Sequence, residues 1–475
     1  MRPKFSMRRA LKDPALLGSD LARESWRLWR VMLIAAMGEG LRPSERKLFA
    51  KFTGREREPG QRVQEACFVV GRRGGKDRAA AALAVYLASL CDHRAVLAPG
   101  ERGLVLCLGA DQRQAKITFD YIEAAFTDSP LLAQLLAKRT NDTLELKNRI
   151  TIEVRAASFR RLRGVTAVAV IASEVAFWMD QETSTNPDTE ILNAVRPALA
   201  TTGGPLILIS SPYARKGVLW DIYEKDFGPT GDPLILVAHG ASRDFNSTLP
   251  QQVVDRALDR DPAAARAEYL AEWRTDVETF VAREAVDACV SHGILERAPS
   301  GDPNTFYKAF CDPSGGSKDS MTLAIAHRQD DRAVLDVIRE VRAPFSPESV
   351  VREFSDVLTL YGLNRLSGDK YAGEWPREQF MRFGIRYVPA EKTKSDLYLD
   401  LLPAINSRLV DLLDHNRLLA QLVGLERKTG RGKDVIDHPK HAHDDVANAA
   451  AGALNLVLNR KRWEVTPMET GLPIV

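Results

Sequence analysis

Phe68-Val69-Val70-Gly71-Arg72-Arg73-Gly74-Gly75-Lys76-Asp77 is a short apolar run that meets a turn rich in glycine and arginine, and the chain is organised around it. The turn ends in Gly-Lys and opens an alanine- and leucine-rich segment, residues 78–90, which predicts a helix. A strand, a glycine loop, a lysine and a helix together form a phosphate cradle. In it Gly71, Gly74 and Gly75 let backbone N–H groups approach phosphate oxygens, and the helix N-terminus adds partial positive charge. Lys76 would reach the β and γ phosphates, and Arg72 and Arg73 would neutralise nucleotide charge.

This loop departs from the usual pattern in two places. Its spacing is Gly-x3-Gly-Lys, one residue short of the usual Gly-x4-Gly-Lys. The residue after Lys76 is Asp77, where a serine or threonine normally holds magnesium. An ordinary glycine turn between a strand and a helix therefore remains the alternative.

A second apolar strand, Val168 to Glu174, favours the nucleotide-site interpretation, because it ends in an acid. In phosphate-loop ATPases such a strand usually ends Asp-Glu, with the Asp on magnesium and the Glu on the attacking water. Here Glu174 is present but Ser173 replaces the Asp. We hypothesise an exchange in which Asp77 supplies the metal-binding charge and Ser173 the hydroxyl. The alternative is that the two changes weaken magnesium binding and ATP hydrolysis.

Composition sets broad limits on the class of protein. The chain has 475 residues, 45% hydrophobic and 27% charged, with a formal net charge of +3, which is ordinary for a globular protein of several domains. The five cysteines are scattered and favour buried, reduced thiols over a disulfide framework. No apolar run is long enough to cross a membrane, and we expect neither membrane association nor a secretory signal.

The order of predicted elements indicates an α/β protein with a parallel sheet flanked by helices, followed by a second α/β domain. In the second domain three antiparallel strands precede a helix, a strand, a helix and a strand, which is the order of a ribonuclease H-like fold. The predicted divisions are a helical N-terminal lead-in over 1–60, a P-loop ATPase domain over 61–245, a helical linker over 246–303, a ribonuclease H-like nuclease domain over 304–460, and a tail over 461–475.

Acids stand where a ribonuclease H-like sheet would bring them together. Asp312 and Asp369 each end a strand, and Asp444 and Asp445 open the last helix. Three such acids would hold two divalent ions that activate water and stabilise the leaving oxygen of a phosphodiester. Each acid alone could instead start a turn or cap a helix. Both Asp444 and Asp445 are candidates for the third ligand, with a slight preference for Asp444.

Basic and histidine-containing segments lie near both candidate sites. Arg160, Arg161 and Arg163 would contact DNA or a neighbouring subunit's nucleotide, or form a solvated loop. His438, His441 and His443 precede the last acids and would contact metal or DNA, or lie on the surface; a zinc site is the least favoured alternative, because no cysteine is near. The loop over 426–433 would contact the DNA backbone, cover the site or stay solvated.

Together these motifs resemble the large terminase subunit of tailed bacteriophages. The resemblance covers about residues 45–460 and rests on the phosphate loop, the strand ending in Glu174, Ser210-Ser211-Pro212, Asp312, Asp369 and His443-Asp444-Asp445, and also on Arg163-Gly164 and Glu268-Tyr269-Leu270. It implies a motor that uses ATP and Mg²⁺ to move double-stranded DNA into a procapsid, and a nuclease, which could also use Mn²⁺, that cuts concatemeric DNA.

The same resemblance implies a small terminase subunit, the portal protein and a ring of copies as partners. It places the chain in the cytoplasm of the infected host and transiently at the portal, and not in the mature virion. Asp77 and Ser173 are departures from the family pattern. The rival interpretations are a helicase-nuclease of repair or recombination, and a weakened prophage remnant that only binds portal or DNA.

Overall fold

The computed structural model describes residues 2–157, 164–180, 187–317, 319–370, 375–429, 434–439 and 442–458. The chain forms two compact units, which meet in the sequence between Glu278 and Thr279, inside the segment predicted as a helical linker. All five cysteines are buried and free, as expected from their positions in apolar runs. Within the described ranges, no helix combines the length and apolarity needed to span a bilayer.

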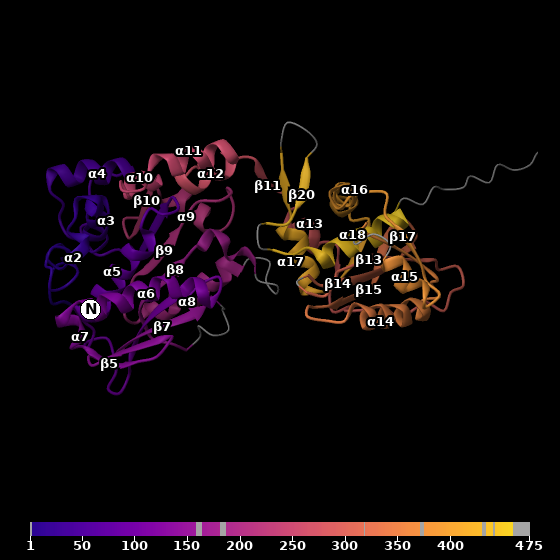
Figure 1. Ribbon diagram of the computed structural model, residues 1–475, viewed down its shortest axis with the longest axis horizontal. Coiled ribbons are helices and arrows are strands. Elements are labelled where there is room, and N and C mark those ends of the chain that lie inside the picture. Colours follow the sequence, from indigo (N-terminus) through magenta and orange to yellow (C-terminus); the bar gives the residue numbers. More distant parts are fainter. Residues whose placement is uncertain are drawn as a thin grey trace, which may run out of the picture. The chain divides into compact units, whose positions relative to one another are not determined.

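The first unit is built on an eight-stranded sheet in the order β10-β2-β9-β8-β4-β7-β6-β5 (Figure 1). Its strands from β10 to β7 run parallel, and β6 and β5 add an antiparallel edge. The strand bounds are β2 (Glu65–Val70), β4 (Gly103–Gly109), β5 (Leu136–Arg139), β6 (Thr143–Leu146), β7 (Ile150–Ala156), β8 (Ala167–Ser173), β9 (Leu206–Ser210) and β10 (Ile235–Gly240). The prediction of a parallel sheet flanked by helices is therefore confirmed.

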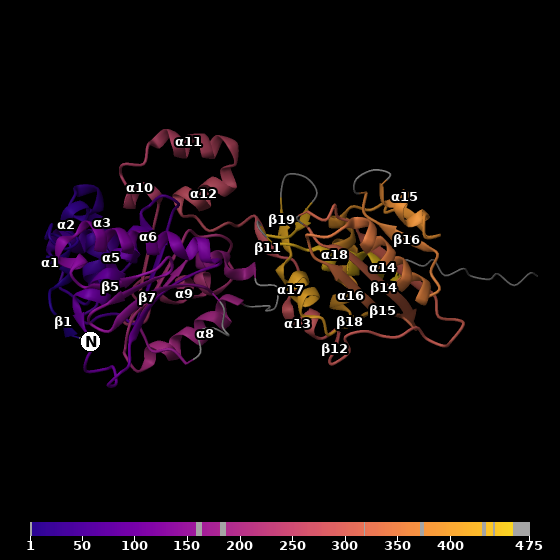
Figure 2. The ribbon, with the colours of Figure 1, turned by 60° about the horizontal axis from the view of Figure 1, so that its bottom comes forward.

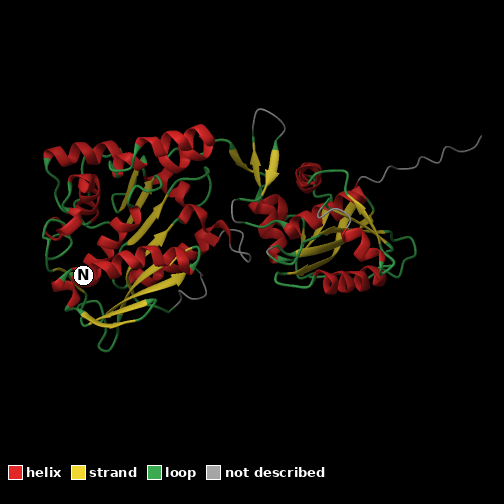
Figure 3. Ribbon diagram, viewed as in Figure 1, coloured by secondary structure: helices red, strands yellow, loops and turns green. Residues whose placement is uncertain are grey.

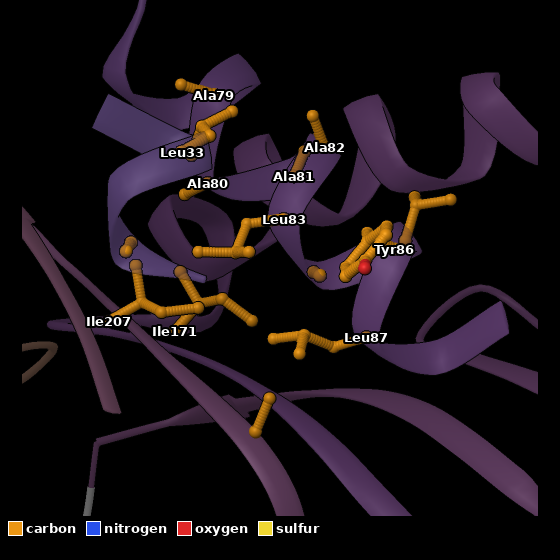
Figure 4. Packing of buried hydrophobic residues seen from close by; sticks show 14 of the residues in the cluster. Leu33, Ala79, Ala80, Ala81, Ala82, Leu83, Tyr86, Leu87, Ile171 and Ile207 are labelled. Atoms are coloured by element: carbon orange, nitrogen blue, oxygen red, sulfur yellow. The ribbon is translucent and has the colours of Figure 1, made fainter. Parts of the chain in front are cut away.

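Both faces of this sheet are buried, which explains why its strands are nearly continuous apolar runs. On β2, Phe68 and Val70 pack toward one core and Cys67 and Val69 toward the other. The covering helices are α5 (Lys76–Ser89) and α6 (Gln112–Asp128) on one face, and α8 (Pro187–Ala200) and α9 (Val218–Asp226) on the other. Figure 4 shows Leu83 of α5 directed toward the strands that carry Ile171 and Ile207.

The N-terminal segment belongs to the core of the first unit. Leu33 and most other residues of α3 are buried in the same cluster as α5. Short elements complete this region: β1 (Arg2–Pro3), α1 (Met7–Ala10), α2 (Gly18–Leu21), η1 (Glu24–Trp26), α3 (Arg27–Ala36), α4 (Pro43–Thr53), β3 (Cys91–Asp92), α7 (Pro130–Ala133) and η3 (Val175–Asp180). The group formed by α10 (Ser242–Phe245), α11 (Gln251–Arg260) and α12 (Pro262–Leu270) is seen best in Figure 2. Strand β11 (Val277–Thr279) spans the division between the units.

The second unit has a seven-stranded sheet in the order β12-β18-β15-β14-β13-β16-β17. Strands β13, β14 and β15 are antiparallel neighbours, and β16 and β17 continue parallel to β13. This is the arrangement of the predicted ribonuclease H-like fold, with β18 added beside β15 and β12 beside β18. The strand bounds are β12 (Val290–Ser291), β13 (Tyr307–Asp312), β14 (Met321–Gln329), β15 (Arg332–Val341), β16 (Arg365–Gly368), β17 (Arg386–Pro389) and β18 (Val410–Leu413).

Helices cover both faces of this second sheet (Figure 3). Alternation again sets the faces, since Phe310 packs with the core around α18 and its neighbours Ala309 and Cys311 pack with α14. The helices are α13 (Arg283–Asp287), α14 (Pro347–Leu360), α15 (Trp375–Met381), α16 (Lys394–Asn406), α17 (Asn416–Gly424) and α18 (Asp445–Leu458). The start of the predicted basic loop forms β19 (Glu426–Lys428), which pairs antiparallel with β20 (Val435–Asp437), a strand just beyond that loop.

Candidate nucleotide and nuclease sites

The glycine turn lies at the carboxyl end of β2, where ligands bind in parallel α/β sheets. Gly75 adopts φ 86° and caps α5, and Arg73 also has a positive φ of 64°. A β-carbon on Gly71 would lie 2.4 Å from the hydroxyl of Ser242, so this position has no room for a side chain. The turn therefore has the backbone freedom and the helix N-terminus that a phosphate cradle needs.

Three side chains from outside the turn hold its consecutive carbonyl groups. The hydroxyl of Ser242 donates to the carbonyl of Arg72 at 2.6 Å, and the amide of Asn246 donates to that of Arg73 at 2.8 Å. The indole N–H of Trp29, which is 1% exposed, donates to the carbonyl of Gly74 at 2.8 Å. The N–H groups of Gly71, Arg72 and Gly74 donate to backbone carbonyls, which leaves those of Arg73 and Gly75 without a hydrogen bond among the described residues.

Lys76 and Glu174 meet at the centre of this site. The Lys76 Nζ lies 2.8 Å from Glu174 Oε1 and 3.3 Å from Ser211 Oγ, and Lys76 is 3% exposed. Glu174 has a left-handed backbone with φ 54°, a strained conformation that tends to occur at functional sites. Its other oxygen accepts hydrogen bonds from Ser210 Oγ and Ser211 N–H, each at 3.3 Å. The ends of β2, β8 and β9 thus converge on one cluster, as their order in the sequence predicted.

Asp77 and Ser173, the two residues that depart from the family pattern, lie close together, and Thr118 contacts both. The hydroxyl of Thr118 lies 3.3 Å from Asp77 Oδ1 and 3.1 Å from Ser173 Oγ. Burial raises the pKa of Asp77, and the nearby Lys76 opposes that shift. Carboxylate and hydroxyl oxygens are hard ligands of the kind that Mg²⁺ takes, so this donor set fits a magnesium ion.

The arginines of the turn face outward. The guanidinium of Arg72 lies 3.2 Å from the carboxylate of Glu268 on α12, and the backbone N–H of Arg72 donates to the backbone carbonyl of Glu268. The Arg73 side chain is exposed. Arg160, Arg161 and Arg163 lie outside the described residues.

Asp312 and Asp369 lie side by side at the ends of the parallel strands β13 and β16, as predicted. Asn448 bridges them: its amide nitrogen donates to Asp312 Oδ2 at 2.9 Å and to Asp369 Oδ2 at 2.7 Å. Burial raises the pKa of both acids, and the charge of Asp369 raises that of Asp312 further. The fully buried Oδ1 of Asn448 has no hydrogen-bond partner among the described residues, an oxygen that a hydrated cation would satisfy.

Asp444 and Asp445 have different surroundings. Both oxygens of Asp444 lie within 3.2 Å of the Lys394 ammonium, and one accepts a hydrogen bond from the Tyr398 hydroxyl at 2.9 Å. Among the described residues, the carboxylate of Asp445 accepts a single hydrogen bond, from the backbone N–H of Ser320 at 3.3 Å. Burial, and then the charge of Asp444, raises the pKa of Asp445. Both acids therefore lie at the site, but Asp444 is engaged by protein groups.

His438 lies near the third acid, and His443 is exposed. His438 Nε2 is 4.0 Å from Asp444 and 3.8 Å from Asp437, and the Lys394 ammonium already contacts both carboxylates. His443 faces Asp319 at 3.7 Å. His441 and residues 430–433 lie outside the described residues.

Sequence reasoning missed several residues that complete the two sites. They are a tryptophan, a serine and an asparagine that hold the turn, a threonine and an asparagine on helices, and a lysine and a tyrosine on α16: Trp29, Ser242, Asn246, Thr118, Asn448, Lys394 and Tyr398. A polar residue on an otherwise apolar helix face was the available signal for Thr118 and Asn448.

Comparison with known proteins gives matches only among solved structures, since no family model and no curated protein matches. The large terminase of bacteriophage HK97 is 15% identical, with 91% of this chain and 99% of that chain covered and a TM-score of 0.38. The large terminase of a thermophilic bacteriophage is 12% identical, with 91% and 98% covered and a TM-score of 0.37. The large terminase nuclease of the thermophilic phage G20c is 18% identical, with 36% and 95% covered and a TM-score of 0.31. These are structures of the family that the sequence motifs resemble, although at such scores the likeness assigns neither activity nor partners to this chain.

Proposed function

We propose that the chain is the ATPase and nuclease subunit of a motor that packages phage DNA. The observation that carries the proposal is the presence of two complete polar clusters in one chain. In the first unit Lys76 and Glu174 meet at a phosphate-loop turn, and in the second Asp312 and Asp369 meet at the ends of neighbouring strands. The first cluster suits ATP hydrolysis and the second suits phosphodiester cleavage.

In the proposed ATPase, the N–H groups of Arg73 and Gly75 and the N-terminus of α5 bind the phosphates, and Lys76 neutralises their charge. Glu174 orients the attacking water by accepting a hydrogen bond from it. Asp77 and Ser173 hold Mg²⁺, which when bound supplies charge neutralisation on the β and γ phosphates. Ser210 and Ser211 contact Glu174, and Ser211 also contacts Lys76, so both serines are placed to respond to the terminal phosphate.

In the proposed nuclease, Asp312, Asp369 and Asp445 hold divalent ions, Mg²⁺ or Mn²⁺, which when bound supply an activated water and charge stabilisation of the leaving oxygen. We favour Asp445 over Asp444 as the third metal ligand, because the Asp444 carboxylate already pairs with the Lys394 ammonium and accepts a hydrogen bond from the Tyr398 hydroxyl. Asn448 fixes the spacing of Asp312 and Asp369.

Double-stranded DNA would be moved by the ATP-driven motor and would be the substrate of the nuclease. The proposal includes a small terminase subunit, the portal protein of the procapsid and a ring of copies of this chain as partners. Its place of action would be the cytoplasm of the infected bacterium and, transiently, the portal.

The test is a paired assay of DNA-stimulated ATP hydrolysis and of plasmid cleavage with Mg²⁺ or Mn²⁺. We expect Lys76→Ala to abolish hydrolysis and keep cleavage, and Asp312→Asn to do the reverse. Asp400→Asn is the matched control, because this acid pairs with Lys392 at the surface of α16. Loss of both activities in either variant would contradict two separate sites.

A prophage remnant with weakened catalysis, which only binds portal or DNA, is a second candidate. Asp77 and Ser173 favour it, because each stands where the family pattern has a different metal-binding residue. A wild-type chain with neither activity would support the remnant, and ATP-driven strand separation would support a helicase-nuclease instead. The exchanged variant Asp77→Ser/Ser173→Asp addresses the pair directly. If the exchange hypothesis holds, this variant hydrolyses ATP while Asp77→Ala loses turnover at limiting magnesium.

A further inference from the structure

Thr118 is a polar residue on the otherwise apolar buried face of helix α6. The buried face of α6 consists of Ala115, Thr118, Phe119, Ile122 and Phe126, and Thr118 is fully buried on it. A threonine inside a helix commonly either faces solvent or donates its hydroxyl to the carbonyl four residues earlier. Thr127 on the same helix does so, donating to the carbonyl of Glu123 at 3.0 Å.

The hydroxyl of Thr118 is instead directed at the two unusual residues of the nucleotide site. It lies 3.3 Å from Asp77 Oδ1 on α5 and 3.1 Å from Ser173 Oγ at the end of β8. Helix α6 packs against α5 and against β4, β7 and β8, so the threonine is carried by a well-supported element.

The direction of the protons in this chain of contacts follows from hydrogen-bond chemistry. An ionised carboxylate can only accept, so Thr118 donates its single hydroxyl proton to Asp77. The contact between Thr118 and Ser173 then requires Ser173 to donate to Thr118. With its proton committed, the oxygen of Ser173 keeps its lone pairs for another partner. A hydroxyl that ligates a cation needs this arrangement.

We propose that Thr118 is a positioning residue of the ATPase: it accepts a hydrogen bond from the hydroxyl of Ser173 and donates its own to Asp77, so that both oxygens are presented to one divalent cation. The inference rests on the proposed ATP hydrolysis, and it assigns Thr118 a role that acts through Ser173 and Asp77. It also explains how a serine can replace an aspartate at the end of β8, since the hydrogen-bond chain fixes the orientation of that serine.

The test measures binding of a non-hydrolysable ATP analogue with and without Mg²⁺, using the full chain. We expect Thr118→Val, which keeps the shape and removes the hydroxyl, to bind the analogue in EDTA within about twofold of wild type. Its apparent Mg²⁺ affinity falls about tenfold or more, the scale of losing a group that orients a metal ligand. Thr118→Ser restores the Mg²⁺ dependence, and Thr127→Val is the matched control that leaves it unchanged.

A double-mutant cycle separates positioning from packing. If Thr118 orients Ser173, Thr118→Val costs less Mg²⁺ affinity in the Ser173→Ala background than in wild type, because only its contact with Asp77 is then left to lose. Additive losses, or wild-type Mg²⁺ dependence in Thr118→Val, would overturn the inference while leaving the ATPase proposal intact. A wild-type chain that binds no nucleotide would overturn the proposed function itself. If Thr118→Val does not fold, Thr118→Ala and Thr118→Ser give the same comparison of absent and present hydroxyl.

Discussion

Replacing Trp29 with phenylalanine separates two roles of this buried residue in the first unit. Its ring packs on Phe68 and Phe245, with centroids 5.3 and 4.7 Å away, and a phenyl ring preserves most of that packing. Its indole N–H donates to the carbonyl of Gly74 at 2.8 Å, and phenylalanine removes this donor. A buried carbonyl left without a partner costs about 1–3 kcal/mol. If that cost falls on the turn that binds phosphate, nucleotide affinity drops about 5- to 150-fold.

Two measurements on Trp29→Phe test this reasoning. Urea denaturation gives the free energy of unfolding, and titration with a fluorescent ATP analogue gives the affinity. The matched control is Trp26→Phe. The Trp26 ring lies beside the same turn, since a β-carbon built on Gly75 would be 3.1 Å from it, but its indole makes no hydrogen bond among the described residues. Equal stability and affinity in Trp29→Phe and wild type would refute the reasoning, and so would equal losses in the two variants.

Three further predictions concern the second unit. Because the pKa of Asp312 is raised in the folded chain, the metal-free protein loses stability as pH rises from the ordinary carboxyl pKa of 3.8 toward the folded pKa. Asp312→Asn therefore raises Tm, and it does so more at pH 8 than at pH 5. The same substitution removes the stabilisation of the fold by Mn²⁺. Asp444→Asn lowers the free energy of unfolding by about 1.5–3 kcal/mol, since its carboxylate accepts bonds from a lysine and a tyrosine, whereas Asp445→Asn chiefly weakens Mn²⁺ binding in a calorimetric titration. Gly452→Ala destabilises the unit by about 1–3 kcal/mol in urea denaturation, because the new β-carbon would lie 2.2 Å from a phenyl ring of β13; Gly424→Ala, with open space around it, is the control.

Local sequence patterns predicted the elements that carry the acids and the turn. The apolar run before Gly71 became β2, the run before Asp312 became β13, and the run before Asp369 became β16. Each run ends at a polar residue or a glycine turn, so the strand end and the candidate ligand are visible together in the sequence. Parallel pairing then brings such ends to one edge, which is why acids distant in the sequence could be grouped in advance.

Contacts that depend on tertiary packing could not be predicted in this way. The residues of 1–60 have a helical period, but periodicity does not say what their apolar face covers. Trp29 reaches Gly74 across a sequence separation of 45 residues, and it does so because α3 packs into the same core as α5. The predicted lead-in therefore contributes a hydrogen bond to the candidate phosphate site, a role that composition and spacing do not record.

Both candidate sites share one arrangement, a buried polar residue on a helix that connects two other site residues. In each, one polar residue on the buried face of a helix joins two members of the site: Thr118 joins Asp77 of α5 to Ser173 at the end of β8, and Asn448 joins Asp312 to Asp369. Burying an amide or a hydroxyl is unfavourable unless it is hydrogen-bonded, so a polar side chain on an apolar helix face implies a polar partner opposite. When that helix must pack over the ends of strands that finish in acids or hydroxyls, those ends are the partners available. A lone polar residue on such a helix therefore predicts the pair of ligands that it connects.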